Sequence, residues 1–350
     1  MKYFFYLFVF ISFSCGQTND DRDQAIGLPG KINIVMTPEL WNDTAGRSLN
    51  SLLSQEMTVL PRPEAIFKTR FVDPEMVNNS MRRTCNLIFV FAMDDDSPKS
   101  MMTKRMLTAE TLSAIQQDTS LYMKAVTDLY AFGQEVLFIF GPDAKTLTRN
   151  IKRNRQKIVD NFNLKERTRF TKGQLNATTT KNITQRLEKD KKFSIKVPFG
   201  YKVADDQKDF VWLRQINAAD DKDIFIARKP YTSQDDFKKE KLVAYRNDIC
   251  RKYLFEDPEI DDTYLVTETE IPDKEVEARE LNFNGLYAVE LKGLWRSNQK
   301  TMGGPFMGIA LVDEKNHQFY YIEGFTYSPS KDQREIMREL ECILYTFKMM

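Results

Sequence analysis

The side chains that most often perform catalysis are few and widely separated in this sequence. His317 is the single histidine, and it lies in the polar segment EKNHQ with no evident partner for proton transfer. Asp94, Asp95 and Asp96 could offer oxygen ligands to a cation, but they lack the glycine-punctuated spacing of a calcium loop. No Cys-x-x-Cys, phosphate-binding loop or nucleophile-elbow serine occurs. We interpret these residues as solvated turns and assign no catalytic residue, cofactor or metal.

Basic side chains are concentrated in one part of the chain. Residues 145–192 carry 15 Lys/Arg and 4 Asp/Glu, whereas residues 256–280 carry 11 Asp/Glu and 2 Lys/Arg. Either the acidic segment folds against the basic one, or both are solvated, or the basic residues form an anion-binding face for lipid phosphate, an acidic glycan or an acidic protein. The candidate anion-binding residues are Lys145, Arg149, Lys152, Arg153, Arg155 and Lys157. Nucleic acid is not expected, because the net charge is only +1 and aromatics do not alternate with the cations.

The amino terminus has the pattern of a secretory signal peptide. Lys2 precedes an apolar run over residues 3–13, which is too short to cross a bilayer core of about 30 Å as a helix. The run ends at Ser14-Cys15-Gly16, which resembles the lipobox of bacterial lipoproteins, in which the peptide is cut before an acylated cysteine. Ser12 departs from that pattern, and an ordinary signal peptide cut nearby is the alternative. We expect Cys15 to carry the lipid.

The remaining cysteines and the later segments add little to the membrane prediction. Cys85, Cys250 and Cys342 lie in apolar or helical patterns, so we expect buried thiols. No later segment reaches 18 consecutive apolar residues. We therefore expect a lipid-anchored protein of the cell envelope, with the outer membrane favoured over the inner one and the side left open.

The elements that position these residues form two α+β halves. In the first half we expect strands over 31–36, 86–91 and 135–140 and helices over 38–53, 121–130 and 143–162. The second half predicts strands over 193–201, 210–216, 224–227, 286–296, 306–312 and 318–327. It also predicts a helix after Ser233, and a final helix over 330–347 that begins with a capping box of Ser330 and Gln333.

The predicted organisation has five parts. They are a lipoprotein signal peptide (1–14), an acidic tether (15–30), an N-terminal α+β domain (31–165), a polar basic linker (166–191) and a C-terminal α+β domain (192–350). In the linker no apolar period is visible. We expect the C-terminal domain to be a largely antiparallel sheet flanked by helices.

Several segments resemble an uncharacterised family of Bacteroidota lipoproteins that is classed as a domain of unknown function. They are GKINIVM (30–36), FGQEVLFIFGPD (132–143), FVWLRQ (210–215), GLWRSNQKTMGGPFM (293–307) and EGFTYSPSKDQREIMRELECIL (323–344). The resemblance implies an envelope address and no activity. Separately, FSIKVPFGY and the final helix ending in YTFK are similar to the sandwich of the photosystem-II extrinsic P-subunit and of Ran-binding proteins, which implies a binding role for residues 192–350.

Two functions fit these observations. The first is a non-enzymatic, lipid-anchored binding or assembly module of the cell envelope. Its partners would be an envelope protein, an acidic glycan or lipid phosphate. The alternative is an envelope hydrolase that acts on glycans with a pair of Asp/Glu carboxylates, since glycoside hydrolysis needs no other side chains.

Overall fold

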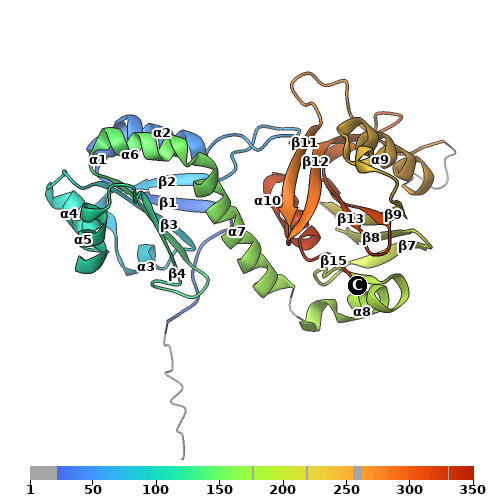
Figure 1. Ribbon diagram of the computed structural model, residues 1–350, viewed down its shortest axis with the longest axis horizontal. Coiled ribbons are helices and arrows are strands. Elements are labelled where there is room, and N and C mark those ends of the chain that lie inside the picture. The colour runs from blue at the N-terminus through green and yellow to red at the C-terminus, as the bar shows by residue number, and fades with distance from the viewer. Residues whose placement is uncertain (1–21, 176, 218–219, 255–261, 330) are drawn as a thin grey trace, which may run out of the picture.

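Two sheets, each with helices on both faces, lie side by side in the computed structural model, and the long helix α7 runs between them (Figure 1). The structure describes residues 22–175, 177–217, 220–254, 262–329 and 331–350. The predicted signal peptide and Cys15 lie outside these residues. In the described part of the chain, no helix is both long and apolar enough to cross a membrane.

The N-terminal sheet is mixed, with the strand order β2-β1-β3-β5-β4. The first four strands in this order are parallel, and the edge strand β4 is antiparallel to β5. The strands are β1 (Lys31–Val35), β2 (Lys68–Val72), β3 (Asn86–Ala92), β4 (Met123–Thr127) and β5 (Glu135–Gly141). The helices are α1 (Pro38–Asn42), α2 (Thr44–Leu53), the 3-10 helix η1 (Pro74–Met76), α3 (Asn79–Arg82), α4 (Pro98–Lys104), α5 (Ala109–Gln117), α6 (Ala144–Arg153) and α7 (Arg155–Gln174).

The continuous apolar runs predicted as strands are buried on both faces of this sheet. Every residue of β3 and β5 is buried. Alternate residues of β3 face opposite ways, so that Phe89 packs in the cluster with α5 and Ile88 packs in the cluster with α2, α6 and α7. Helices α2 and α6 therefore lie together on one face of the sheet, where Figure 1 shows them side by side.

The C-terminal sheet is antiparallel and curled, with the order β10-β12-β13-β14-β9-β8-β7, and β11 also pairs with β12. Its strands are β7 (Lys202–Gln207), β8 (Phe210–Ile216), β9 (Asp221–Pro230), β10 (Leu265–Thr267), β11 (Glu277–Phe283), β12 (Leu286–Ser297), β13 (Gly303–Asp313) and β14 (Gln318–Tyr327). A separate pair joins β6 (Phe193–Ser194) to β15 (Lys348–Met349). The helices are α8 (Ala177–Lys191), the 3-10 helix η2 (Gln234–Phe237), α9 (Lys239–Tyr253) and α10 (Arg334–Leu344).

Helices α10 and α9 cover opposite faces of the C-terminal sheet. Leu340 and Ile343 of α10 join one apolar cluster, and Leu242 and Ile249 of α9 join the other. The expected α+β class, with a largely antiparallel C-terminal sheet, is thereby confirmed.

Three local predictions are corrected by the structure. Residues 121–130 were expected to be helical, but they contain strand β4; Tyr122 and Val126 are four residues apart, a spacing that suits both a helix face and a strand face. The strand predicted over 193–201 is only β6, and beyond it the Lys196 N–H donates to the Thr346 hydroxyl and not to a neighbouring strand. The segment 166–191, in which no period was visible, is helical in α7 and α8.

The predicted start of the final helix is also corrected. Ser330 lies outside the described residues, and α10 begins at Arg334, with Gln333 at the N-cap making no side-chain capping bond. Instead the Glu64 carboxylate, from the N-terminal domain, accepts hydrogen bonds from the backbone N–H groups of Gln333 (2.6 Å) and Arg334 (3.0 Å). Glu64, about 270 positions away in the sequence, thus accepts hydrogen bonds from backbone N–H groups at the amino end of this helix.

A fully buried ion pair ties α9 to the middle of the C-terminal sheet. Arg246 of α9 and Glu323 of β14 are both inaccessible to solvent, and the guanidinium donates to both carboxylate oxygens at 2.8 Å. The Tyr321 hydroxyl donates to the same carboxylate at 2.7 Å, and Thr267 accepts from Arg246 at 3.1 Å. The guanidinium also lies 3.9 Å from the ring centre of Phe306. Each buried charge is therefore compensated.

Replacing Arg246 by Met is expected to lower the free energy of unfolding by about 3–5 kcal/mol, because the Glu323 carboxylate would remain buried without its counter-charge. Urea denaturation followed by circular dichroism measures this change. As a control, Lys238→Met removes an exposed pair with Asp235 and should leave the unfolding midpoint unchanged. If the two substitutions lowered the free energy of unfolding equally, burial of the Arg246–Glu323 pair would not be the cause.

Candidate functional site

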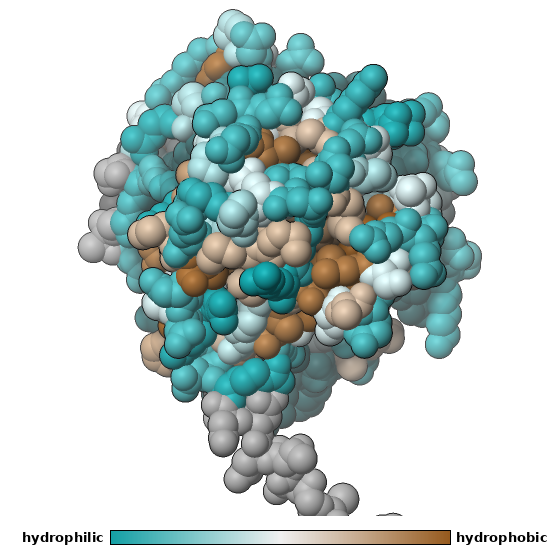
Figure 2. Space-filling model, turned by 90° about the vertical axis from the view of Figure 1, so that its left-hand side faces the viewer, coloured by the Kyte–Doolittle hydropathy of each residue, from teal (hydrophilic) through white to brown (hydrophobic). Residues whose placement is uncertain are grey.

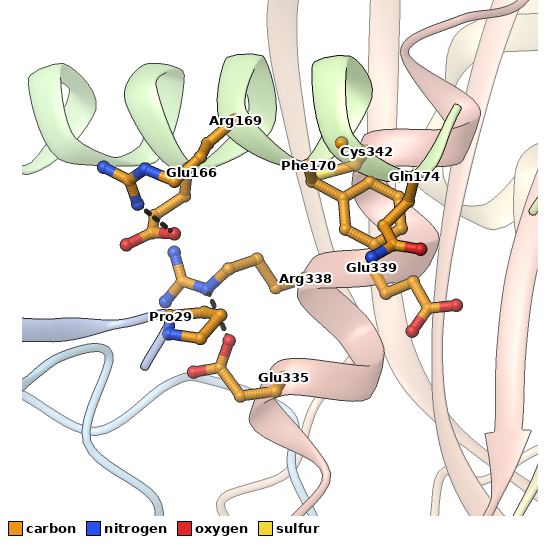
Figure 3. Close-up of a pocket in the computed structure, with 10 residues that line it drawn as sticks. Pro29, Glu166, Arg169, Phe170, Gln174, Glu335, Arg338, Glu339 and Cys342 are labelled. Carbon is orange, nitrogen blue, oxygen red and sulfur yellow. Dashed lines mark ion pairs between the residues drawn. The ribbon is translucent and has the colours of Figure 1, made fainter. Parts of the chain in front are cut away.

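A group of charged side chains lines a pocket of about 300 Å³ between the two domains. Helices α7 and α10 form its walls, and the segment before β1 contributes Pro29 (Figure 3). We call it the interdomain pocket. Its lining consists of Pro29, Glu166, Arg169, Phe170, Gly173, Gln174, Glu335, Arg338, Glu339 and Cys342.

Glu166 on α7 is the most buried carboxylate of this pocket, at 3% exposure. It accepts hydrogen bonds from the backbone N–H of Gly30 (3.0 Å) and from Asn86 Nδ2 (2.7 Å). Arg169 pairs with it at 2.8 Å. Gly30 has φ +67°, a left-handed conformation that favours glycine, and a Cβ atom there would require the Glu335 carboxylate to move.

Arg338 on α10 reaches across the pocket into the N-terminal domain. Its Nη2 donates to the Ile66 carbonyl at 2.7 Å, and its Nη1 donates to Asn163 Oδ1 at 3.1 Å. The guanidinium carbon lies 4.9 Å from the ring centre of Phe67, and Nε lies 3.4 Å from a Glu335 oxygen (Figure 3). The side chain is buried, so it acts as a cross-link between backbone, amide and aromatic groups of the other domain.

The other carboxylates of the pocket are also engaged. Glu335 accepts from Arg334 Nε at 2.7 Å, and Glu339 lies 2.6 Å from Lys222 Nζ. Burial raises the pKa of the Cys342 thiol well above its usual range, so this cysteine is not a ready nucleophile. Each glutamate of the pocket has a cationic partner, and the arrangement joins the domains rather than presenting a free carboxylate pair for acid–base chemistry.

The six cations predicted to bind anions have a different environment. They lie on α6 and the first turn of α7, and all six are exposed. Within the described residues, none of them forms an ion pair with a carboxylate. We call this set (Lys145, Arg149, Lys152, Arg153, Arg155 and Lys157) the basic face.

The acidic segment, residues 256–280, is not the partner of the basic face where the structure describes it. Carboxylates of this segment pair with other cations. Glu268 and Glu270 lie 3.2 and 3.0 Å from Arg296, and Glu270 also lies 2.6 Å from Lys300. These are contacts within the C-terminal domain. Between the segments as far as the structure describes them, no ion pair joins the acidic to the basic one.

Part of the basic face borders a groove between α2 and α6, which has a volume of about 440 Å³. The lining residues are Ser48, Ser51, Leu52, Gln55, Ile151, Lys152 and Arg155. Four of the six predicted cations therefore lie outside the groove. The contribution of α2 was not visible in the sequence, because it depends on how two helices about 100 residues apart pack on the same sheet.

The other candidate residues from the sequence, His317 and Asp94–Asp96, lie in a turn and a loop of the structure. His317 is exposed in the turn between β13 and β14. The loop of Asp94–Asp96 follows β3, and the buried Lys104 holds it by donating to the carbonyls of Met93 (2.8 Å) and Asp95 (2.7 Å). Among the described residues, no group of three His, Cys, Asp or Glu side chains is placed to hold a metal ion.

Two further features are the three predicted thiols and the outer end of the N-terminal domain. Cys85, Cys250 and Cys342 are buried free cysteines, as expected. Figure 2 views the end of the molecule that the N-terminal domain forms, and it shows apolar side chains gathered among hydrophilic ones. Two methionines of that domain, Met76 and Met102, are exposed at 67% and 37%. Exposed apolar side chains are common on protein surfaces, and these alone assign no function.

Comparison with known proteins assigns no activity. Residues 25–192 match the family described as domain of unknown function DUF8532, and residues 180–346 match domain of unknown function DUF4837. No curated protein matches the chain. Two solved structures show a distant likeness, each over 45% of this chain and 90% of the other, with a TM-score of 0.30. They are the Ran-binding protein Mog1p of Saccharomyces cerevisiae (9% identity) and a mutant of the protein Mog1 (10% identity).

These findings confirm the coarser part of the expected resemblance. Two parts of the chain match families that are described as domains of unknown function. The bacterial lipoprotein family stays a prediction.

Replacing Arg338 by Met is expected to lower the free energy of unfolding by about 1–3 kcal/mol and to separate the unfolding of the two domains, because the Ile66 carbonyl and the Asn163 amide oxygen would lose their hydrogen-bond donor. Differential scanning calorimetry measures both effects. Lys68→Met removes an exposed pair with Asp332 at the same interface and is the matched control, expected to change neither. A single unchanged transition in Arg338→Met would contradict the cross-linking role.

Proposed function

We propose that this chain is a non-enzymatic, lipid-anchored binding module of the cell envelope, which uses the basic face on α6 and α7 to hold an acidic partner. The anchor would be a lipid on Cys15. The partner would be an acidic glycan, an acidic envelope protein or lipid phosphate. No reaction is assigned to the chain.

One observation carries this proposal: the basic face is exposed and lacks carboxylate partners in the described residues, whereas the charges of the interdomain pocket satisfy one another. Like charges at this density on a helix repel one another and destabilise it by a few tenths of a kcal/mol per pair. An acidic ligand removes that repulsion. The surface is therefore suited to binding an anion, and it gains stability when it does so.

The alternative of an envelope hydrolase has less support. A glycosidase needs one carboxylate free to act as an acid and another free to act as a base or nucleophile. Glu166, Glu335 and Glu339 line a common pocket, but each is held by a cation within 2.6–2.8 Å. We therefore favour binding over hydrolysis.

The position at which the chain enters the N-terminal domain supports a particular orientation of this domain relative to the membrane. Ala25 and Ile26 hydrogen-bond along the edge of the domain, to the carbonyls of Phe132 and Arg83. This entry lies at the lower edge of the domain in Figure 1, whereas α6 lies at its upper edge. A lipid on Cys15 would thus hold the domain by the side opposite the basic face.

Replacing Cys15 by Ala in the full-length chain is expected to move the protein from the membrane to the water-soluble fraction, because the acyl chains supply the attachment. Detergent phase partition of cell extracts, together with the mass of the mature amino terminus, measures this change. A Cys85→Ala variant is the control and should stay in the membrane fraction. Recovery of the wild-type chain in the cytosol with Met1 intact would contradict the anchor.

Changing the six residues of the basic face to Gln is expected to weaken binding to a sulfated glycan, heparin, at least about tenfold at physiological ionic strength. Salt-gradient elution of the full-length chain from immobilised heparin measures it. The control changes six exposed lysines of the C-terminal domain to Gln: Lys196, Lys202, Lys208, Lys239, Lys241 and Lys315. If both variants elute at the same salt concentration, the basic face is not the binding surface.

A further inference from the structure

The groove between α2 and α6 collects hydrogen-bond donors and no carboxylate. Lys152 and Arg155 stand at one side, and the hydroxyls of Ser48 and Ser51 belong to the other helix. Leu52 and Ile151 are almost completely buried and form its apolar floor. A volume of about 440 Å³ lies within the range of small-ligand pockets, about 300–1,000 Å³.

One of the two cations is already oriented. Arg155 Nη2 donates to Gln55 Oε1 at 3.2 Å, which fixes the guanidinium at the rim and leaves its remaining N–H groups for another acceptor. A guanidinium held in this way loses less conformational freedom when it binds a phosphate.

The amino end of α7 adds to the positive potential at the same place. Arg155 is the first residue of this 20-residue helix, and its N-cap, Asn154, makes no side-chain capping bond. The positive end of the helix dipole is therefore directed toward the rim of the groove at Arg155. This feature supplements Lys152 of α6 and the serine hydroxyls of α2, which belong to other helices.

We propose that this groove is a binding site for a phosphorylated sugar. Lys152 and Arg155 would bind the phosphate oxygens, and Ser48, Ser51 and Gln55 would bind sugar hydroxyls. The inference rests on the proposed function, since it identifies where on the basic face an acidic glycan is recognised and by which groups.

The anchoring geometry favours a glycan over the phosphates of the bilayer to which the chain is attached. From Cys15 to Asp23, whose carbonyl is bonded to Phe132 N, the chain can span at most about 27 Å. A domain of this size measures about 38 Å across. Such a short connection cannot turn the opposite side of the domain toward the same membrane, so the groove faces away from it.

A matched pair of double variants tests the site. Lys152→Gln with Arg155→Gln removes the two cations that line the groove, and Arg153→Gln with Lys157→Gln removes two exposed cations of the same face outside it. Both change the charge by the same amount within about one helical turn. Circular dichroism checks that each variant is folded.

Isothermal titration calorimetry of the full-length, detergent-solubilised chain with glucose 1,6-bisphosphate is the measurement. We expect the groove variant to lose at least about tenfold in affinity and the control variant about threefold or less. Free glucose and inorganic phosphate should each bind more weakly than the bisphosphate, because each satisfies only part of the groove. Ser51→Ala should weaken the bisphosphate and leave inorganic phosphate unchanged.

Other outcomes would overturn the inference in distinguishable ways. Equal losses of affinity in the two double variants would mean that the bisphosphate is attracted to the whole basic face. The proposed function would then remain, but the groove would not be a specific binding site. Binding to vesicles that contain phosphatidylglycerol without binding to the bisphosphate would replace the sugar by a lipid headgroup. If neither the bisphosphate, heparin nor the vesicles bind, the groove fails together with the glycan and lipid forms of the proposed function.

Discussion

The structure depends on the position of one helix, α10, which belongs to both domains. Its apolar face completes the core of the C-terminal sheet, and its polar face bonds to the N-terminal domain through Arg334 and Arg338. The amino end of the helix is satisfied by Glu64 of that other domain. A helix end whose backbone N–H groups lack hydrogen-bond acceptors is unfavourable. Separation of the two domains would remove these acceptors from α10 and is therefore disfavoured.

This constraint decides which charges are available for function. Where α7 meets α10, carboxylates and cations are buried or half-buried together, and each has a partner because an unpaired charge in a poorly solvated site is unfavourable. The cations of α6 are subject to no such requirement, since they are exposed to solvent. The interior charges therefore hold the fold together, and the surface charges remain free to bind.

The sequence predicted the parts of the fold that local patterns determine. Continuous apolar runs identified β3 and β5, and the apolar stripe of Ile336, Leu340 and Ile343 identified α10. The edge strands β2 and β4 were missed or misassigned because an edge strand has little buried surface to impose a period of two. The cap of α10 could not be found, since Glu64 is distant in sequence and belongs to the other domain.

The same distinction applies to the candidate site. The sequence indicated the cations of the basic face as part of a charged helix, and the charged side chains of such a helix are usually exposed to solvent. A groove is a relation between two elements, and it exists because Leu49 and Leu52 of α2 and Ile151 of α6 pack in one apolar cluster. That packing fixes the spacing between the serine hydroxyls and the two cations. Charge alone attracts any anion, whereas a fixed spacing of donors discriminates between anions, so specificity here depends on the core beneath the groove.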